Sequence, residues 1–509
     1  MSLSPQGHAV LFSYEGWGHL RPLTVLAAKI VKARPILVTI LTSNQYIDRV
    51  ETEVSRSFPV ENAARRDLIR IIAMPIEKGA NPLTFDGINA AFATTYKQLV
   101  NGDPVKCDKT NTIYDSHPAP TAVVLDFFGK GPLDLVRSVH SVKAYAWYTG
   151  SASCLVWPFG PAREDYREKV SSIVKETGRS FDDVAEEIVF EASGKVVRVP
   201  GLPPMYDYEY QPQGSIVKGG IGKLLVAGRA CLDECDGLIF TTPEPYEPEA
   251  IAGVRTWFGE KSRPIFPLGP LLPDYDETTS AQEKKMTEKS QELDQFMDSV
   301  LASHGPKTMI YIAFGSFFWP TQPDKLWALL DVLIEKKIPF VMSHASPLAV
   351  VPETVKEKVD KSGLGLLSKW LPQQSILSHP ATAWFVTHCG QNSALEAVMS
   401  SVPMICWPCQ GDQPANAAYL SHTLDVAYEL YEIRSELGLK PILRNGKVPV
   451  GTLEAVREEA ATVLQNAFLA DGQRKRENLS KVRERILGTW AESGSSKLAL
   501  DELVKTLGA

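Results

Sequence analysis

The sequence lacks the segments that place a protein in or across a membrane. No run of roughly 18 or more apolar residues occurs among its 509 residues, so no membrane-spanning helix is expected. The opening residues, MSLSPQGHAV, show no charged stretch followed by an apolar one, and the closing LVKTLGA carries no lipidation motif. We therefore expect no secretory signal and a cytoplasmic protein.

A basic surface is also missing. The net charge is −7 and no stripe of Lys and Arg is visible, which argues against a general nucleic-acid binder. The composition, with 44% apolar and 22% charged residues, is typical of a soluble globular protein. A chain of this length favours two or more domains over one.

The cysteines do not form a recognisable disulfide framework. There are seven, an odd number, at irregular spacing, so a reducing compartment is expected. Cys406 and Cys409, in CWPC, have the spacing of a dithiol redox site. Such sites open a helix, whereas this stretch has the pattern of a strand running into a loop. We expect two reduced thiols there, with redox chemistry as a distant alternative.

Two glycine-rich stretches fall short of nucleotide-binding fingerprints. GWGHLR has Arg21 where G-x-G-x-x-G requires its third glycine. GGIGKLL has Val217 at the first glycine position of a P-loop and Leu224 in place of Ser or Thr. Asp274 and Asp276 form a D-x-D pair, but they lie in a polar stretch where a solvated turn is the simpler interpretation. No metal site is predicted.

The first half of the chain alternates short apolar runs with helical patterns. Apolar runs lie at 8–14, 35–43, 68–75, 121–128, 142–150 and 236–251. Helical patterns at 22–33 and 44–56 follow the first two runs, and 152–235 is mainly helical. This alternation predicts a parallel sheet with helices on both faces.

The second half repeats the pattern. Strands are predicted at 307–316 and in PFVMSH, LGLLSKW, AWFVTH and VPMICWP, with a helix at 324–337. The expected organisation is a domain at 1–263, a linker at 264–291, a second domain at 292–470 and C-terminal helices at 471–509 that pack back on the first domain. Two doubly wound, Rossmann-like halves would face a central cleft, with ligands at the carboxyl ends of the strands.

One corner of the second half has the features of a phosphate site. In FVTHCGQNSALEA an apolar strand ends at His388, small residues follow, and a helix begins near Asn392 and Ser393. The free N–H groups at that helix start would bind a diphosphate, and His388 would add a donor. The carboxylate of Glu396 could accept from both hydroxyls of a ribose. Alternatively, Asn392 or Ser393 simply caps the helix and Glu396 only complements its dipole.

The surrounding stretch, 369–417, resembles the donor-binding signature of the family 1 UDP-dependent glycosyltransferases of plants and fungi. That signature runs from a Trp to a Gln over 44 residues, as Trp370 to Gln413 does here (413 − 370 + 1 = 44). The residues in phase with it are Trp370, Pro372, Gln373, His379, Pro380, His388, Gly390, Asn392, Ser393, Glu396, Pro403, Trp407, Pro408, Asp412 and Gln413. The resemblance implies an α/β fold of GT-B type.

The resemblance also implies roles for individual residues. Trp370 would stack on uracil with Gln373 at its edge, and Glu396 would hold the ribose. The other donor-binding positions that it implies are Gly18, Thr149, Ser316, His388, Gly390, Gln391, Asn392, Ser393, Asp412 and Gln413. The Gln at the last position usually accompanies glucose, so UDP-glucose is the expected donor. Gln391 departs from the Trp of plant members, which leaves the sugar preference less defined.

A candidate base lies in the first half. His19 follows the first strand and precedes a helix expected to open at Pro22, so the helix dipole would keep the imidazole neutral. Asp126 ends another strand in the same crevice and could orient His19. The resemblance assigns the same roles, base and partner. Trp17, Phe92 and Phe127 are expected to line the acceptor site, although each could be core packing.

Together these features predict an inverting hexosyltransferase that moves a sugar from a UDP-sugar to a hydroxyl of a hydrophobic small molecule. No cofactor or metal is expected, the UDP-sugar being a co-substrate, and the chain is expected to be a monomer. The acceptor would be set by loops at 75–120 and 150–230, whose aromatic residues suggest a phenol, flavonoid, sterol or hydroxylated lipid. A UDP-sugar epimerase and a non-catalytic nucleotide-sugar sensor remain alternatives.

Overall fold

The structure is a computed structural model. It describes residues 4–58, 63–77, 85–115, 117–161, 163–215, 219–273 and 289–508. Asp274, Asp276, Val217 and most of the expected linker lie outside the described residues.

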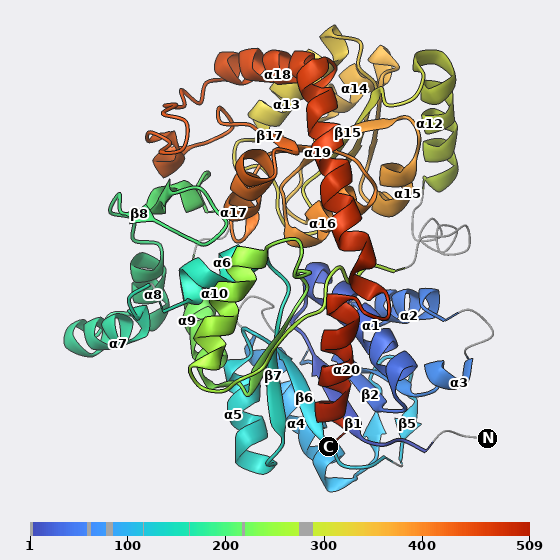
Figure 1. Ribbon diagram of the computed structural model, residues 1–509, viewed down its shortest axis with the longest axis vertical. Helices are drawn as coiled ribbons and strands as arrows, with labels where there is room; N and C mark the ends of the chain where they lie inside the picture. Colours follow the sequence, from blue (N-terminus) through green and yellow to red (C-terminus); the bar gives the residue numbers. More distant parts are fainter. Residues whose placement is uncertain are drawn as a thin grey trace.

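A seven-stranded parallel sheet forms the core of the first lobe, the lower one in Figure 1. Its order is β11-β10-β7-β6-β1-β2-β3. The strands are β1 (His8–Phe12), β2 (Leu37–Thr42), β3 (Ile69–Ala73), β6 (Ala122–Asp126), β7 (Lys143–Tyr148), β10 (Gly237–Phe240) and β11 (Ile265–Pro267). Nearly all of their side chains are buried, because helices cover both faces, and this explains the continuous apolar runs in the sequence.

The helices of this lobe mostly connect successive strands. They are α1 (Trp17–Ala33), α2 (Ile47–Arg56), α3 (Ala63–Arg66), α4 (Asp86–Asn101), α5 (Lys130–Val139), α6 (Ala152–Phe159), α7 (Tyr166–Thr177), α8 (Phe181–Val189), α9 (Ile221–Glu234) and α10 (Pro248–Gly259). Short hairpins pair β4 (Val105–Lys106) with β5 (Ile113–Tyr114), and β8 (Val196–Val197) with β9 (Met205–Tyr206). A 3-10 turn, η2 (Asp207–Tyr210), follows β9 and reaches towards the second lobe.

The second lobe is built on a six-stranded parallel sheet of order β14-β13-β12-β15-β16-β17. Its strands are β12 (Met309–Ala313), β13 (Phe340–Ser343), β14 (Gly365–Ser368), β15 (Thr382–Thr387), β16 (Met404–Cys406) and β17 (Ala427–Glu429). Its helices are α12 (Ser290–His304), α13 (Pro323–Glu335), α14 (Glu353–Ser362), α15 (Gln373–Ser378), α16 (Gln391–Met399), α17 (Gln413–Ala418) and α18 (Leu453–Ala467). The predicted pair of doubly wound parallel sheets is thus confirmed.

The last two helices connect the lobes. α19 (Ala470–Leu487) leaves the second lobe, and α20 (Ser495–Leu507) lies along the first, where Leu503 and Leu507 are fully buried in its core (Figure 1). Ser496 donates to the carbonyl oxygen of Gly269 at 2.5 Å and fixes the start of α20. β11, which lies inside the segment expected to be a linker, pairs with β10 and belongs to the first sheet.

Two further findings bear on the sequence-based expectations. No helix in the described part of the chain is long and apolar enough to cross a membrane. All seven cysteines are buried and unpaired. Cys406 ends β16 and Cys409 lies in the loop that follows, and burial raises the pKa of Cys409 to about 12. Neither cysteine opens a helix, and the raised pKa of Cys409 is the opposite of what a dithiol redox site requires of its reactive thiol.

Candidate functional site

His19 and Asp126 form a close pair in the first lobe. Nδ1 of His19 lies 2.7 Å from Oδ2 of Asp126, which is the last residue of β6 and is completely buried. Ser13 donates to the same carboxylate oxygen at 2.9 Å. Because a carboxylate can only accept, Nδ1 of His19 carries the proton and Nε2 is the basic atom of the neutral ring. The His19 side chain keeps 29% of its surface exposed, enough to meet a ligand.

Two expectations about His19 are wrong. Helix α1 begins at Trp17 rather than Pro22, so His19 lies inside its first turn, and Pro22 lies within the helix. The pKa of His19 is raised, not lowered: burial alone would lower it, but the charge and hydrogen bond of Asp126 and the charge of Asp412 more than offset burial. The effect expected of the helix dipole is outweighed by these two carboxylates.

The predicted phosphate corner forms at the end of β15. α16 begins at Gln391 after Gly390, and no side chain caps it, so Asn392 and Ser393 are not helix caps. The His388 ring is enclosed by backbone: a Cβ atom at Gly315 or Gly390 would lie 2.8 or 2.6 Å from its Nε2. Only glycine leaves room for the ring at both positions. Burial lowers the pKa of His388 to about 4, so the ring is neutral.

Residues predicted to bind the nucleotide lie together and touch the first lobe. Asn392 donates from Nδ2 to the carbonyl oxygen of Gly18 at 2.6 Å. Glu396 is 3% exposed and accepts from Arg21 on one carboxylate oxygen and from Gln373 on the other. Gln373 also donates to Ser393 Oγ at 3.2 Å.

Trp370, the predicted uracil platform, follows β14. The guanidinium of Arg49, from α2, lies 4.5 Å from the centre of its ring. The ring is half-buried and packs against the core of the first lobe. Cation and ring attract each other because the aromatic face carries negative potential. One face of the Trp370 ring is therefore already in contact with Arg49 of the first lobe.

Asp412 links the loop after β16 to the start of α16. Its Oδ2 accepts from the main-chain N–H of Gln391 at 3.0 Å and from Asn416 Nδ2 at 2.9 Å. Burial raises the pKa of Asp412 to about 6. Although Asp412 precedes α17, its side chain makes no cap hydrogen bond there, so it remains directed to these two partners.

Gln413 has a fixed orientation. Its Oε1 accepts the main-chain N–H groups of Cys409 at 2.8 Å and Gln410 at 3.1 Å. Its Nε2 is buried and has no hydrogen-bond partner within the described part of the chain. A buried amide without a partner is costly, so this N–H₂ group is suited to a ligand oxygen. Gln391 donates from Nε2 to Thr242 Oγ1 at 3.1 Å.

The predicted acceptor residues are mostly core. Phe92 is completely buried and packs on Tyr96 and Phe12, and Trp17 is 8% exposed within the same core. Both side chains pack in the core, and their role at the acceptor site stays a prediction. Phe127 is also buried, but its ring stacks near that of His19, with centres 6.3 Å apart.

Two predicted donor residues, Thr149 and Ser316, make no side-chain hydrogen bond within the described part of the chain. Thr149 is 7% exposed, and its carbonyl oxygen accepts from Thr241 Oγ1 at 3.2 Å. Ser316 is half-buried in the turn after β12. Their proposed contacts with the donor therefore rest on position alone.

The sequence matches a known family model and curated relatives. The model described as UDP-glucoronosyl and UDP-glucosyl transferase matches residues 247–438. UDP-glycosyltransferase eriJ of Hericium erinaceus is 29% identical over 517 residues, covering 98% of this chain and 99% of that protein. UDP-glycosyltransferase 72B1 of Arabidopsis thaliana is 25% identical, covering 98% and 96%.

The chain matches the UDP-glycosyltransferase family model over residues 247–438 and is similar to UDP-glycosyltransferases over nearly its whole length. It is a glycosyltransferase that uses a UDP-sugar.

Solved structures show the same fold for this UDP-glycosyltransferase. A glucosyltransferase of Polygonum tinctorium that glucosylates indoxyl aligns with a TM-score of 0.69 at 20% identity, over 100% of both chains. A Siraitia grosvenorii transferase in complex with UDP aligns with a TM-score of 0.69 at 19% identity, over 99% of this chain and 100% of that one. The fold is GT-B.

Several residues at the UDP-glycosyltransferase site were not predicted. Arg21 was noted only because it breaks a glycine fingerprint, and Asn416, Thr242 and Glu247 were not considered. The Glu247 carboxylate accepts from the main-chain N–H groups at the start of α6, at 2.9 and 3.2 Å. Arg21, Thr242 and Glu247 act across long sequence separations, so no local pattern points to them, whereas Asn416 bonds Asp412 four residues away.

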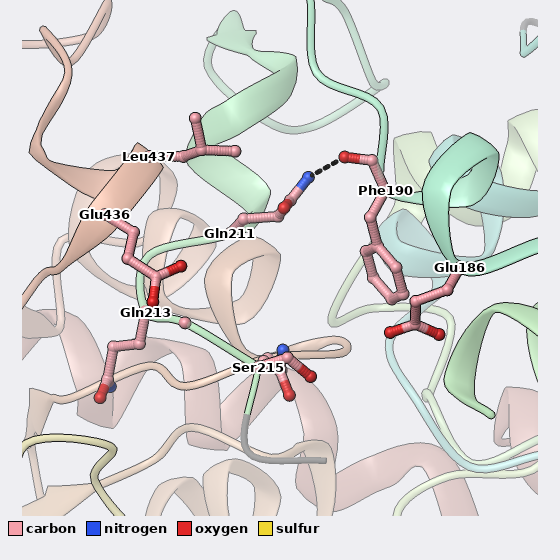
Figure 2. Close-up of a pocket in the computed structure, with 9 residues that line it drawn as sticks. Glu186, Phe190, Gln211, Gln213, Ser215, Glu436 and Leu437 are labelled. Atoms are coloured by element: carbon pink, nitrogen blue, oxygen red, sulfur yellow. Dashed lines mark hydrogen bonds between the residues drawn. The ribbon is translucent and has the colours of Figure 1, made fainter. Parts of the chain in front are cut away.

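A cavity of about 170 Å³ lies near this site, where residues 211–215 pass between α8 and the second lobe. Figure 2 shows Glu186 and Glu436 on two of its sides and the Gln211 amide donating to the carbonyl oxygen of Phe190. Its lining contains none of the predicted site residues. Gln410 lines the cavity and donates its main-chain N–H to Gln413, one of the predicted donor-binding residues. The cavity therefore adjoins the predicted donor site.

Proposed function

We propose that this enzyme transfers glucose from UDP-glucose to a hydroxyl of a hydrophobic small molecule, with inversion, giving a β-glycoside. The observation that supports it most is that the His19–Asp126 pair adjoins the donor corner: Gly18, next to His19, bonds to Asn392 of α16. In a one-step displacement the base and the site of the leaving diphosphate must both lie close to the anomeric carbon, and this contact brings them together.

In the proposed step, Nε2 of His19 takes the acceptor proton as the acceptor oxygen forms its bond to the anomeric carbon. The bond from that carbon to the phosphate oxygen breaks, and UDP carries away the electron pair. Asp126 stabilises the imidazolium through Nδ1. The N–H groups at the start of α16, with Ser316 and neutral His388, stabilise the departing diphosphate. The proposal assigns no metal or cofactor.

We further propose the sugar and nucleotide contacts. Trp370 stacks on uracil after Arg49 moves from its face, Glu396 holds the ribose, and Nε2 of Gln413 donates to a sugar hydroxyl. Asp412 accepts from a second hydroxyl. Because a polar site rejects sugars that leave its groups unpaired, these contacts favour glucose. Gln391, Thr149 and Gly18 complete the donor side.

For the acceptor we propose an aromatic or otherwise flat hydrophobic alcohol. Phe127 and half-buried Phe128 stack near the His19 ring, with centres 6.3 and 6.1 Å away. The Phytolacca americana relative is described in complex with UDP-2-fluoro-glucose and pterostilbene, and the Polygonum relative acts on indoxyl. We also propose the domain division 1–263, 264–291, 292–470 and 471–509, with the first domain binding acceptor and the second binding donor.

The test is UDP release from several UDP-sugars with a panel of phenolic, flavonoid, sterol and lipid alcohols, followed by NMR of the anomeric proton in the product. UDP-glucose with an aromatic alcohol should be the best pair, and the product should be β. Free monosaccharide without acceptor would favour an epimerase that frees UDP. Tight UDP binding with no turnover on any pair would favour a sensor.

A further inference from the structure

A ladder of alternating charges crosses between the lobes twice. Glu396 of α16 pairs with Arg21 of α1, whose Nε donates to Glu53 at 2.9 Å. Arg56 Nη1 donates to the other oxygen of Glu53 at 2.9 Å, and its Nη2 donates to Gln374 Oε1 at 2.7 Å. The ladder thus starts in the second lobe, passes through the first and returns.

The ladder is largely removed from water. The side chains of Glu53 and Arg56 are 1% exposed, Glu396 is 3% and Arg21 is 13%. Two carboxylates face two guanidinium groups, so its charges balance. Buried ion pairs hold a defined geometry strongly, because breaking one leaves an uncompensated charge. Arg21 is therefore held on Nε by Glu53 while it bonds Glu396 through Nη1.

This arrangement leaves Glu396 able to bind a diol. A carboxylate has about four lone-pair positions, two on each oxygen. Arg21 takes a position on Oε1 and Gln373 takes one on Oε2. One position remains on each oxygen, which is the arrangement needed to accept from two neighbouring hydroxyls. Fixing the carboxylate in advance reduces the entropy lost when the ribose binds.

The same turn of α1 carries the base. Gly18 and Arg21 lie on either side of His19, and each bonds to α16, through Asn392 and Glu396. We propose that Arg21 is a positioning residue: it holds the Glu396 carboxylate in the orientation that binds the ribose. This inference rests on the proposed function, in which Glu396 binds the ribose and His19 is the base.

The test compares two donors, UDP-glucose and its 2′-deoxyribose analogue, with wild-type enzyme and with Arg21→Gln. If Arg21 acts through the ribose contact, Arg21→Gln should lower kcat/KM about tenfold on UDP-glucose but less than about twofold on the deoxy donor. A merely structural role would lower both equally. Arg21→Lys, which keeps the charge but not the planar fork, should recover part of the loss.

Arg229→Gln is the matched control, because Arg229 is a similarly buried arginine of the first lobe bonded to Gly160 and Asp233 and away from Glu396. Its effect should be the same on both donors. If Arg21→Gln does not fold, the donor comparison is made with Arg21→Lys, where the loss should again be larger on UDP-glucose.

Two results would overturn the inference. One is an equal loss on both donors while the wild type still discriminates between them. The other is faster transfer or tighter UDP binding in Arg21→Gln, which would show that the pair with Glu396 blocks the site. A wild-type enzyme that does not discriminate between the donors, together with full activity of Glu396→Gln, would instead remove Glu396 from the proposed function.

Discussion

Asn392 donates its side-chain amide to the carbonyl oxygen of Gly18 across the two lobes, at 2.6 Å. In an α-helix that carbonyl would accept from the N–H four residues later, but that residue is Pro22, which has none. The proline therefore leaves an acceptor free in the first turn of α1, and the second lobe supplies the donor. The turn that carries the proposed base and the proposed nucleotide corner are joined at this point.

The pH dependence of kcat/KM should show the titration of His19 as its pKa is set by Asp126. A base works when unprotonated, and Asp126 raises the pKa of His19, so the acidic limb of kcat/KM should lie above pH 6.5. Asp126→Asn removes the charge, so the limb should move to lower pH while kcat falls by about a hundredfold or more. Ser13→Ala, which removes only a hydrogen bond to Asp126, should shift the limb little. An unmoved limb in Asp126→Asn would mean that another group titrates.

Substitution of Gln413 should weaken recognition of the sugar but leave the affinity for UDP unchanged. Gln413→Glu can still accept from Cys409 and Gln410 but replaces the free N–H₂ group with an oxygen. We expect kcat/KM for UDP-glucose to fall by roughly tenfold or more, with UDP affinity unchanged by calorimetry. Gln410→Glu makes the same chemical change three residues away and should have a much smaller effect. Equal losses in both variants would remove Gln413 from the sugar site.

Buried neutral histidine should make the fold sensitive to acid. His8 is fully buried, its Nδ1 donates to Pro118 at 2.8 Å, and burial lowers its pKa to about 4. The unfolded chain takes up this proton near pH 6.5, so stability is complete above that pH and is lost as pH falls towards 4. The loss should reach about 3 kcal/mol.

His8→Gln, which cannot titrate but can still bond Pro118 and Thr39, should reduce this dependence without abolishing it in urea unfolding at pH 4.5 to 7. His388, with a pKa also lowered to about 4 by burial, should keep a similar acid dependence in that variant. An identical slope in His8→Gln and wild type would show that His8 is protonated in the folded state.

Glu209 should anchor the 193–215 segment of the first lobe to the second. It is fully buried, accepts the main-chain N–H groups of Tyr206 and Leu443 at 2.9 and 3.0 Å, and pairs with Arg444. Glu209→Gln should lower the free energy of unfolding by roughly 3 kcal/mol, because Arg444 loses a buried partner. Glu357→Gln, in the exposed pair with Lys361, should cause no measurable change. Equal stability of both variants would contradict this.

The sheets and the donor corner could be predicted because their signals are local. Buried parallel strands such as β1 and β15 appear as short apolar runs, and helices between them repeat the pattern. The start of α16 lies within two residues of the prediction, since Gly390 and small residues mark the turn. These features depend on neighbouring residues alone.

Contacts between the lobes could not be predicted in this way. Arg21 and Glu396 are 375 residues apart in the sequence, and no periodic pattern of residues can predict a contact over that separation. Phe92 was placed at the acceptor site because aromatic residues suit both a core and a binding site, and only the packing shows that it is core. The pKa of His19 was predicted in the wrong direction because the prediction followed the helix dipole, whereas in the folded chain burial lowers this pKa but Asp126, with a smaller contribution from Asp412, more than offsets burial.

The most direct test measures glucose transfer and UDP affinity of His19→Ala in parallel. The proposed mechanism predicts that transfer falls by at least about a hundredfold while UDP binds as in the wild type, because the nucleotide is held by the second lobe. Transfer within about threefold of wild type would contradict the assignment of His19 as the base.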